Sequence, residues 1–202
     1  MPRTLCIFGD SITWGTGASD SGGWADQLKV YYQSTDSDVQ IFNLGIPGDT
    51  AEDVLLRFQS EAGARQGTIA LFAIGINDAQ LRGEVGEEEV RVTDEEFKAN
   101  ILELVGEAAR REMQVAFIGI TRVDESRTLP VAWRSDRHYL NERIDLFDSI
   151  IRDICEDKEL PYLSVASALE SEDLTDGLHP NTAGYDKLFG AILPFLEARL
   201  GL

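Results

Sequence analysis

Two short segments near opposite ends of the chain carry side chains that could together perform acyl transfer. Residues 9–11 read Gly-Asp-Ser directly after an apolar run, and residues 176–179 read Asp-Gly-Leu-His. Ser11 supplies a hydroxyl nucleophile, His179 an imidazole base, and Asp176 a carboxylate that could orient the base. This set of groups fits transfer of an acyl group through a covalent intermediate, because an alcohol needs a base to take its proton.

The position of His179 in the chain favours it as the base. It precedes Pro180, which disfavours helical geometry at the residue before it and suits the first turn of a final helix. Asp176, three residues earlier, can reach one ring nitrogen and leave the other free. His138 is the rival base, but it lies among charged residues at an expected helix start, where we expect a solvated side chain.

The oxyanion formed in acyl transfer needs hydrogen-bond donors, and candidates follow the expected strands. Asn77 offers a side-chain amide and Ser11 its own backbone N–H. The segment between them offers the N–H of Gly45 or of Gly48, and the residues alone do not choose between these two. A nucleotide-binding loop at Ser11 is disfavoured because the chain has neither a Gly-Lys-Ser or Gly-Lys-Thr triplet nor a Gly-x-Gly-x-x-Gly run.

The elements expected to position these groups alternate between short apolar runs and longer amphipathic segments. The expected strands span residues 4–8, 39–43, 69–74, 115–120 and 162–165. The expected helices span residues 23–33, 50–62, 93–111, 136–158 and 180–200. This alternation predicts an α/β fold with a parallel sheet covered by helices on both faces. Ligands bind beyond the carboxyl ends of such strands, where all the candidate groups fall.

Length and composition limit the possible classes of protein. At 202 residues, with 43% hydrophobic and 27% charged residues, the chain (1–202) is expected to form a single domain with a full core. Its 36 acidic and 18 basic residues give a net charge of −18. A negative surface repels nucleic acid and anionic lipid headgroups and favours neutral or cationic substrates. The acidity is typical of a solvated surface, or of adaptation to a saline habitat.

Cysteine usage and hydropathy point to a cytoplasmic protein. Cys6 and Cys155 fall in an expected strand and an expected helix, so we expect separate buried thiols rather than a disulfide. Neither has the spacing of a metal ligand. No apolar stretch of signal-peptide length follows Met1, and no segment approaches the ~20 apolar residues of a membrane span, so we expect no membrane insertion.

Four sequence blocks resemble, in order, the motifs of the SGNH hydrolase family, also called the GDSL esterase/lipase family. They are Phe-Gly-Asp-Ser-Ile-Thr-Trp-Gly at 8–15, Asn-Leu-Gly-Ile-Pro-Gly-Asp-Thr at 43–50, Gly-Ile-Asn-Asp at 75–78 and Asp-Gly-Leu-His-Pro at 176–180. Their span covers nearly the whole chain, and Ile12 stands where members often carry leucine. The chain contains no Gly-x-Ser-x-Gly, which argues against an α/β-hydrolase elbow.

The resemblance implies a flavodoxin-like three-layer α/β/α sandwich with a five-stranded parallel sheet in the order 2-1-3-4-5. It implies Ser11 as nucleophile, His179 as base and Asp176 as its partner. It also implies an oxyanion hole made of the backbone N–H groups of Ser11 and Gly48 and the side chain of Asn77, with no metal or cofactor. The implied activity is hydrolysis of carboxylic esters through an acyl-serine intermediate.

Substrate preference follows less directly from the sequence. Short-chain acyl or acetyl esters are our first choice, and a thioesterase or lysophospholipase of the same family is the alternative. A catalytically silent, flavodoxin-like binding module is the alternative from another class. The candidate walls of a substrate pocket are Trp14, Leu129, Trp133 and Tyr139. Residues 79–92 and 121–135 are expected loops, and loops of this length often act as lids.

Overall fold

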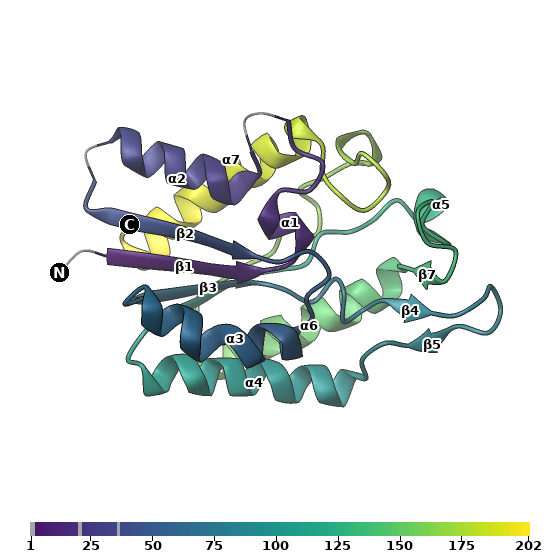
Figure 1. Cartoon of the computed structure of the whole chain (residues 1–202), viewed down its shortest axis with the longest axis horizontal. Helices are drawn as coiled ribbons and strands as arrows, with labels where there is room; N and C mark the ends of the chain where they lie inside the picture. The colour runs from purple at the N-terminus through teal and green to yellow at the C-terminus, as the bar shows by residue number, and fades with distance from the viewer. Residues whose placement is uncertain (1–2, 20–21, 36) are drawn as a thin grey trace.

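A five-stranded parallel sheet forms the centre of the molecule, in the order β2-β1-β3-β6-β8 (Figure 1). The computed structural model describes residues 3–19, 22–35 and 37–202. The strands are β1 (Arg3–Gly9), β2 (Val39–Gly45), β3 (Ile69–Ala73), β6 (Gln114–Ile118) and β8 (Tyr162–Leu163). The predicted order 2-1-3-4-5 is therefore confirmed, although β8 is shorter than the expected strand over residues 162–165.

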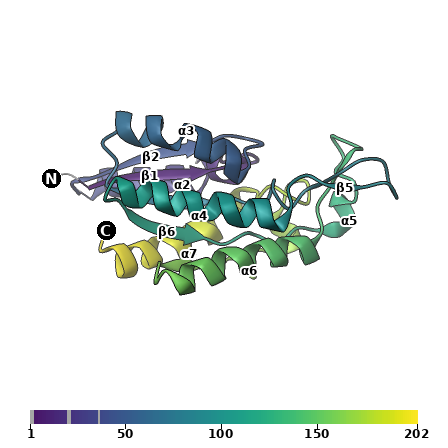
Figure 2. The ribbon, with the colours of Figure 1, turned by 90° about the horizontal axis from the view of Figure 1, so that it is seen from below.

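Helices cover both faces of this sheet and complete three layers (Figures 1 and 2). One face carries α2 (Trp24–Ser34) and α7 (Thr182–Leu200). The other carries α3 (Ala51–Ala64), α4 (Asp94–Arg110) and α6 (Asn141–Asp157).

Successive residues of the central strands supply the two cores on either side of the sheet. In β1, Phe8 packs into the core under α3, α4 and α6, whereas Ile7 packs into the core under α2 and α7. Phe72 and Leu71 divide in the same way in β3. Strands buried on both faces read as continuous apolar runs, which is why the sequence revealed them.

Polar side chains fix the helix starts. At α3, the Thr50 hydroxyl accepts from the Asp53 N–H while the Asp53 carboxylate accepts from the Thr50 N–H, so the two side chains cap the helix reciprocally. The last helix starts two residues later than expected. Asn181 caps it by accepting from the Gly184 N–H at 3.0 Å, so Pro180 lies just outside the helix.

A second, three-stranded antiparallel sheet was not predicted. It consists of β4 (Leu81–Arg82), β5 (Glu89–Val90) and β7 (Arg137–His138), in the order β5-β4-β7. It projects beyond the carboxyl ends of the central strands, beside α5 (Glu125–Thr128) (Figure 1). The helix predicted over residues 136–158 is wrong at its start. Arg137 and His138 pair with β4 instead, and the helix begins only at Asn141.

His138 is also placed differently from the prediction. Its side chain is buried, and Nε2 lies 3.1 Å from the carbonyl oxygen of Gly83, so the expected solvated histidine is wrong. The two cysteines, by contrast, are buried free thiols as predicted. Within the part of the chain that the structure describes, no helix combines the length and the apolar character that crossing a membrane requires.

Candidate active site

Ser11 occupies the first position of a one-turn helix, α1 (Ser11–Trp14), directly beyond the end of β1. Buried Asp10 caps this helix by accepting the Ile12 N–H at 2.9 Å. Gly9 permits the close approach of chain segments here, since a Cβ at this position would lie 2.4 Å from the carbonyl oxygen of Ala73. The strand therefore turns into the helix within one residue, and this abrupt turn places the Ser11 hydroxyl at the carboxyl edge of the sheet.

The loop before α7 brings His179 to Ser11. The Ser11 Oγ lies 2.9 Å from His179 Nε2, and His179 Nδ1 lies 2.7 Å from Asp176 Oδ2. The other oxygen of Asp176 accepts the backbone N–H groups of Leu178 at 3.0 Å and His179 at 2.8 Å. One carboxylate thus fixes both the loop and the ring. Ser11 and His179 are 6% and 9% exposed, so their hydrogen bond is largely shielded from water.

Two carboxyl groups near Ser11 differ in their electrostatics. Burial raises the pKa of Asp176, but the hydrogen bonds from His179 outweigh it and hold the pKa below its usual range. Asp176 is therefore a carboxylate at neutral pH and can stabilise a positive charge on the ring. Burial raises the pKa of Asp10 to about 7 despite the Ile12 N–H. Of these two aspartates, Asp10 caps α1 and Asp176 contacts the imidazole.

The two candidate glycines have different surroundings. Gly48 has φ +92°, lines the pocket in front of Ser11, and would have no neighbour within 4 Å of an added Cβ. Gly45 is packed against α1, where a Cβ would lie 2.4 Å from the Trp14 nitrogen. Gly48 therefore lines the same pocket as Ser11 and Asn77, whereas Gly45 does not.

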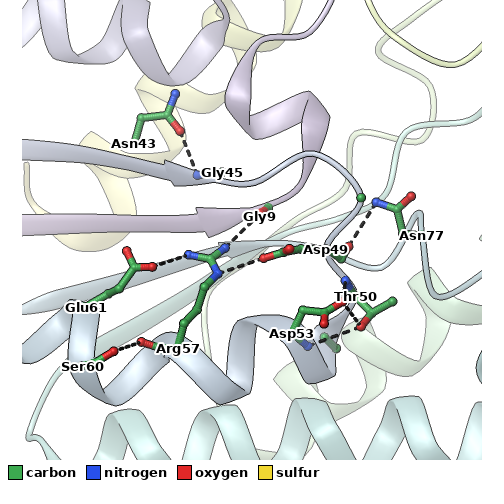
Figure 3. A network of polar contacts seen from close by, with 12 residues as sticks. Gly9, Asn43, Gly45, Asp49, Thr50, Asp53, Arg57, Ser60, Glu61 and Asn77 are labelled. Atoms are coloured by element: carbon green, nitrogen blue, oxygen red, sulfur yellow. Dashed lines mark hydrogen bonds and ion pairs between the residues drawn. The ribbon is translucent and has the colours of Figure 1, made fainter.

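Asn77 is buried and held by hydrogen bonds on both sides of its amide. Its Nδ2 donates to the carbonyl oxygen of Asp49 at 3.1 Å (Figure 3), and its Oδ1 accepts from the Tyr139 hydroxyl at 3.2 Å. The amide orientation is fixed because a hydroxyl donates to one end and a carbonyl accepts from the other.

Arg57 of α3 links the loops around the site, and sequence reasoning missed it. Its guanidinium binds Asp49 Oδ2 at 2.8 Å, Glu61 at 3.2 Å and the carbonyl oxygen of Gly9 at 3.3 Å (Figure 3). One side chain thus joins the end of β1 to the loop after β2, whose Asp49 carbonyl accepts from Asn77. Asp49 and Arg57 lie eight residues apart in the chain, and this short separation is the only feature of the sequence that indicates their contact.

Arg91 stabilises the same loops from the side of the small sheet. It donates to the carbonyl oxygens of Gly48 at 3.1 Å and Asn77 at 3.3 Å. Burial lowers the pKa of Arg91, with a further lowering from nearby Arg82. These contacts fix the two chain segments that bear candidate oxyanion donors.

A pocket of about 240 Å³ opens in front of the Ser11 hydroxyl. It is lined by Ser11, Thr16, Pro47, Gly48, Asn77, Trp133, Arg137, Tyr139, Leu178 and His179. Two of the predicted wall residues, Trp133 and Tyr139, are among them, and the Trp133 ring lies 5.5 Å from the His179 ring. Trp14 and Leu129 are not, and Trp14 is 57% exposed. Sequence reasoning did not single out Arg137 as a lining residue.

The described residues contain no group of three or more His, Cys, Asp or Glu side chains arranged to hold a metal ion. A hydroxyl, an imidazole and a carboxylate lie in hydrogen-bonded sequence at the carboxyl edge of a three-layer α/β/α fold. This fold and site define a hydrolase class in which an alcohol side chain can attack a carbonyl carbon.

The chain belongs to the GDSL-like lipase/acylhydrolase family, whose model matches residues 7–187. The resemblance seen in the four sequence blocks is thereby confirmed, and the protein is a carboxylic ester hydrolase.

Individual relatives are distant but match over nearly their full length. The esterase TesA of Pseudomonas aeruginosa is 22% identical over 202 residues, covering 98% of this chain and 90% of that protein. A lipase/acylhydrolase from Enterococcus faecalis superposes with a TM-score of 0.78 at 24% identity, covering 98% and 96% of the two chains. An acetyl xylan esterase from Geobacillus stearothermophilus gives 0.76 at 20% identity, covering 96% and 94%. These solved structures share the fold described above.

Proposed function

We propose that the protein is a serine esterase in which Ser11 is the nucleophile, His179 the general base and Asp176 the residue that orients it. The observation that carries this proposal is the hydrogen-bonded sequence from Ser11 Oγ to His179 Nε2, at 2.9 Å, and from His179 Nδ1 to Asp176, at 2.7 Å. Such distances allow a proton to pass directly from hydroxyl to ring.

In this proposal the reaction has two steps. His179 takes the Ser11 proton as the hydroxyl attacks the ester carbonyl, and the protonated ring then gives that proton to the departing alcohol. Water, activated by the same ring, attacks the acyl-serine, releases the carboxylic acid and restores Ser11. The negative oxygen formed in each step would be stabilised by the backbone N–H groups of Ser11 and Gly48 and by the side chain of Asn77.

Short-chain acyl or acetyl esters are the proposed substrates. The pocket of about 240 Å³ is small beside the usual range for ligand sites, which begins at about 300 Å³. Trp133 stands over the His179 ring and limits the room for an acyl chain. An acetyl xylan esterase has a similar structure, and an acetyl group is a short acyl group.

A thioesterase or lysophospholipase activity is the alternative within the family. A series of 4-nitrophenyl esters of increasing chain length separates these possibilities. We expect turnover to be greatest for acetate or butyrate, whereas an optimum at long chains would contradict the short-chain assignment. A catalytically silent binding module, the alternative from another class, would hydrolyse none of them.

The proposal is tested by replacing Ser11 with alanine. Ser11→Ala should lose turnover of 4-nitrophenyl acetate and labelling by a fluorophosphonate probe, while its circular dichroism spectrum and melting temperature stay near those of the wild type. Ser149→Ala is the matched control, because Ser149 lies on the surface of α6 and bonds only within its own helix. Retained turnover in Ser11→Ala would exclude Ser11 as the nucleophile.

The proposal also covers the setting in which the enzyme works. Residues 1–202 would form one hydrolase domain that acts in the cytoplasm on a small-molecule ester, without a metal, a cofactor or nucleic acid. The supporting observations are the negative net charge of −18 and the two free, buried cysteines. Activity that survives extensive treatment with a chelator is the expected result.

A further inference from the structure

An arginine of the small sheet lines the pocket in front of Ser11, and a second arginine stands directly across from it. Arg137 of β7 is the lining residue, and the antiparallel register of β4 and β7 pairs it with Arg82 (Figure 1 shows the two strands side by side). Directly opposed residues of an antiparallel pair share a face and lie about 5 Å apart at Cβ. Two like charges in this position destabilise the sheet, and an anion bound between them would offset this cost.

A third guanidinium, that of Arg91, lies close to Arg82. Arg91 donates to the carbonyl oxygens of Gly48 and Asn77, two residues that line the pocket, rather than to a carboxylate. Burial lowers its pKa, and the positive charge of Arg82 lowers it further. The carboxylates of Asp78 and Asp53 act on the pKa of Arg91 in the opposite direction, so the charge of Arg91 is partly compensated.

In the described part of the chain Arg137 forms no ion pair with the acidic side chains around it, although its charge helps to lower the pKa of Asp136. Asp136, its neighbour in sequence, binds Arg134 through both oxygens, at 3.0 and 3.2 Å. Glu89 faces Arg82 from β5 without forming an ion pair, and Glu88 lies near His138 at 4.0 Å. In residues 3–19, 22–35 and 37–202, no carboxylate lies within ion-pair distance of the Arg137 guanidinium. The cation that lines the pocket thus lacks an anionic partner of its own.

We propose that Arg137, reinforced by Arg82, selects esters that carry a carboxylate on their acyl or their alcohol part. This inference rests on the proposed function, because it places the carboxylate in the pocket where Ser11 would attack. The planar fork of a guanidinium matches a carboxylate with two parallel hydrogen bonds, and a carboxylate is compact enough for this small pocket.

The pocket is thus expected to favour anionic substrates, although the net charge of the whole chain favours neutral or cationic ones. A net charge of −18 repels anions over long distances, but salt screens this field within about 8 Å at physiological ionic strength. A half-buried arginine at the pocket wall acts over a shorter distance, and its charge is screened less. A carboxylate-bearing substrate would also relieve the repulsion between Arg82 and Arg137.

Two matched substrate pairs test the inference, one for each side of the ester bond. The first pair compares mono-4-nitrophenyl adipate with its neutral methyl ester, and the second compares 4-acetoxybenzoate with methyl 4-acetoxybenzoate. In at least one pair we expect the anionic member to have the higher kcat/KM in the wild type. Arg137→Gln should lower the anionic-to-neutral ratio at least about ten-fold, mainly through KM, because a hydrogen bond to a charged group is lost.

Two further variants control for position and charge. Arg134→Gln removes an exposed arginine of the same loop that is already paired with Asp136, and it should leave the ratio unchanged. Arg137→Lys keeps the charge and should restore part of the preference. No preference for the anionic member in either pair, or the same ratio in Arg137→Gln as in the wild type, would overturn the inference. Hydrolysis of the neutral esters that depends on Ser11 would then still support the proposed function, so the two can fail separately.

Discussion

The Tyr139 hydroxyl donates a hydrogen bond across 3.2 Å to the side-chain oxygen of Asn77, which lies 62 positions earlier in the chain. The same hydroxyl accepts from the side-chain amide of Gln80, whose oxygen in turn accepts from Arg82 at 3.1 Å. Burial raises the pKa of Tyr139, so its hydroxyl stays protonated and remains a donor. This chain of contacts orients the Asn77 amide so that Nδ2 donates to the carbonyl oxygen of Asp49.

Replacing Tyr139 with phenylalanine tests whether this contact positions the proposed oxyanion donor. The ring still fills its site, but Asn77 loses one of its two anchors. Since a hydrogen bond contributes about 0.5–1.5 kcal/mol, we expect kcat for 4-nitrophenyl acetate to fall about two- to ten-fold with little change in KM. Tyr162→Phe is the control, because its hydroxyl binds Asp148 at the far edge of the sheet. A rise in KM alone would indicate that Tyr139 serves only as a pocket wall.

Replacing Asp176 with asparagine tests the orientation of the His179 ring. The amide keeps the size of the side chain but lacks the negative charge that stabilises the imidazolium and favours a proton on Nδ1. We expect kcat to fall by about 10⁴, as when the corresponding carboxylate is replaced in other serine hydrolases. Asp186→Asn changes an exposed carboxylate of α7, near Gln27, and should leave kcat unchanged. A loss of less than ten-fold in Asp176→Asn would show that the ring is oriented by other contacts.

The sequence predicted the sheet and the groups at its edge because each has a local signature. The strands around Ile7 and Leu71 are continuous apolar runs, which identify strands buried on both faces. The loop at Asp176 holds its histidine through hydrogen bonds within four residues, so the short spacing is itself informative.

The sequence did not reveal the contacts that join distant segments. Strands of two residues, such as those containing Arg82 and Arg137, show no periodicity, so the small sheet and the burial of His138 were not foreseen. Arg57 binds the Gly9 carbonyl across 48 positions, and no local pattern marks a contact between a guanidinium and a backbone oxygen.

Buried Asp78 gives the stability of the protein a predictable dependence on pH. Its two carboxylate oxygens lie 3.0 and 3.1 Å from the backbone nitrogen of Ala51, which ties the loop after β3 to the start of α3. Burial raises the pKa of Asp78 to about 7, while the Ala51 N–H and Arg91 oppose this shift and Asp10 adds to it. The folded protein therefore binds this proton more tightly than the unfolded chain, where an aspartate titrates near about 3.9.

The sign of the effect follows from this difference. Below pH ~4 the group is protonated in both states and costs no stability. As the pH rises from there to about 7, ionisation stabilises the unfolded chain and the free energy of unfolding falls. Asp78→Asn keeps an acceptor for Ala51 without a titrating group. We expect the variant to gain stability relative to the wild type over this range, by about 1.4 kcal/mol for each unit of the pKa difference.

Urea unfolding at pH 4.5, 6 and 7.5 measures this effect for both proteins. Asp153→Asn, on the exposed surface of α6, is the control and should follow the wild-type curve. Asp10 is buried, with its pKa raised in the same direction, so the Asp78→Asn protein should keep a smaller slope of the same sign. A stability difference between Asp78→Asn and the wild type that stays constant across the three pH values would mean that Asp78 does not take up a proton in the folded state.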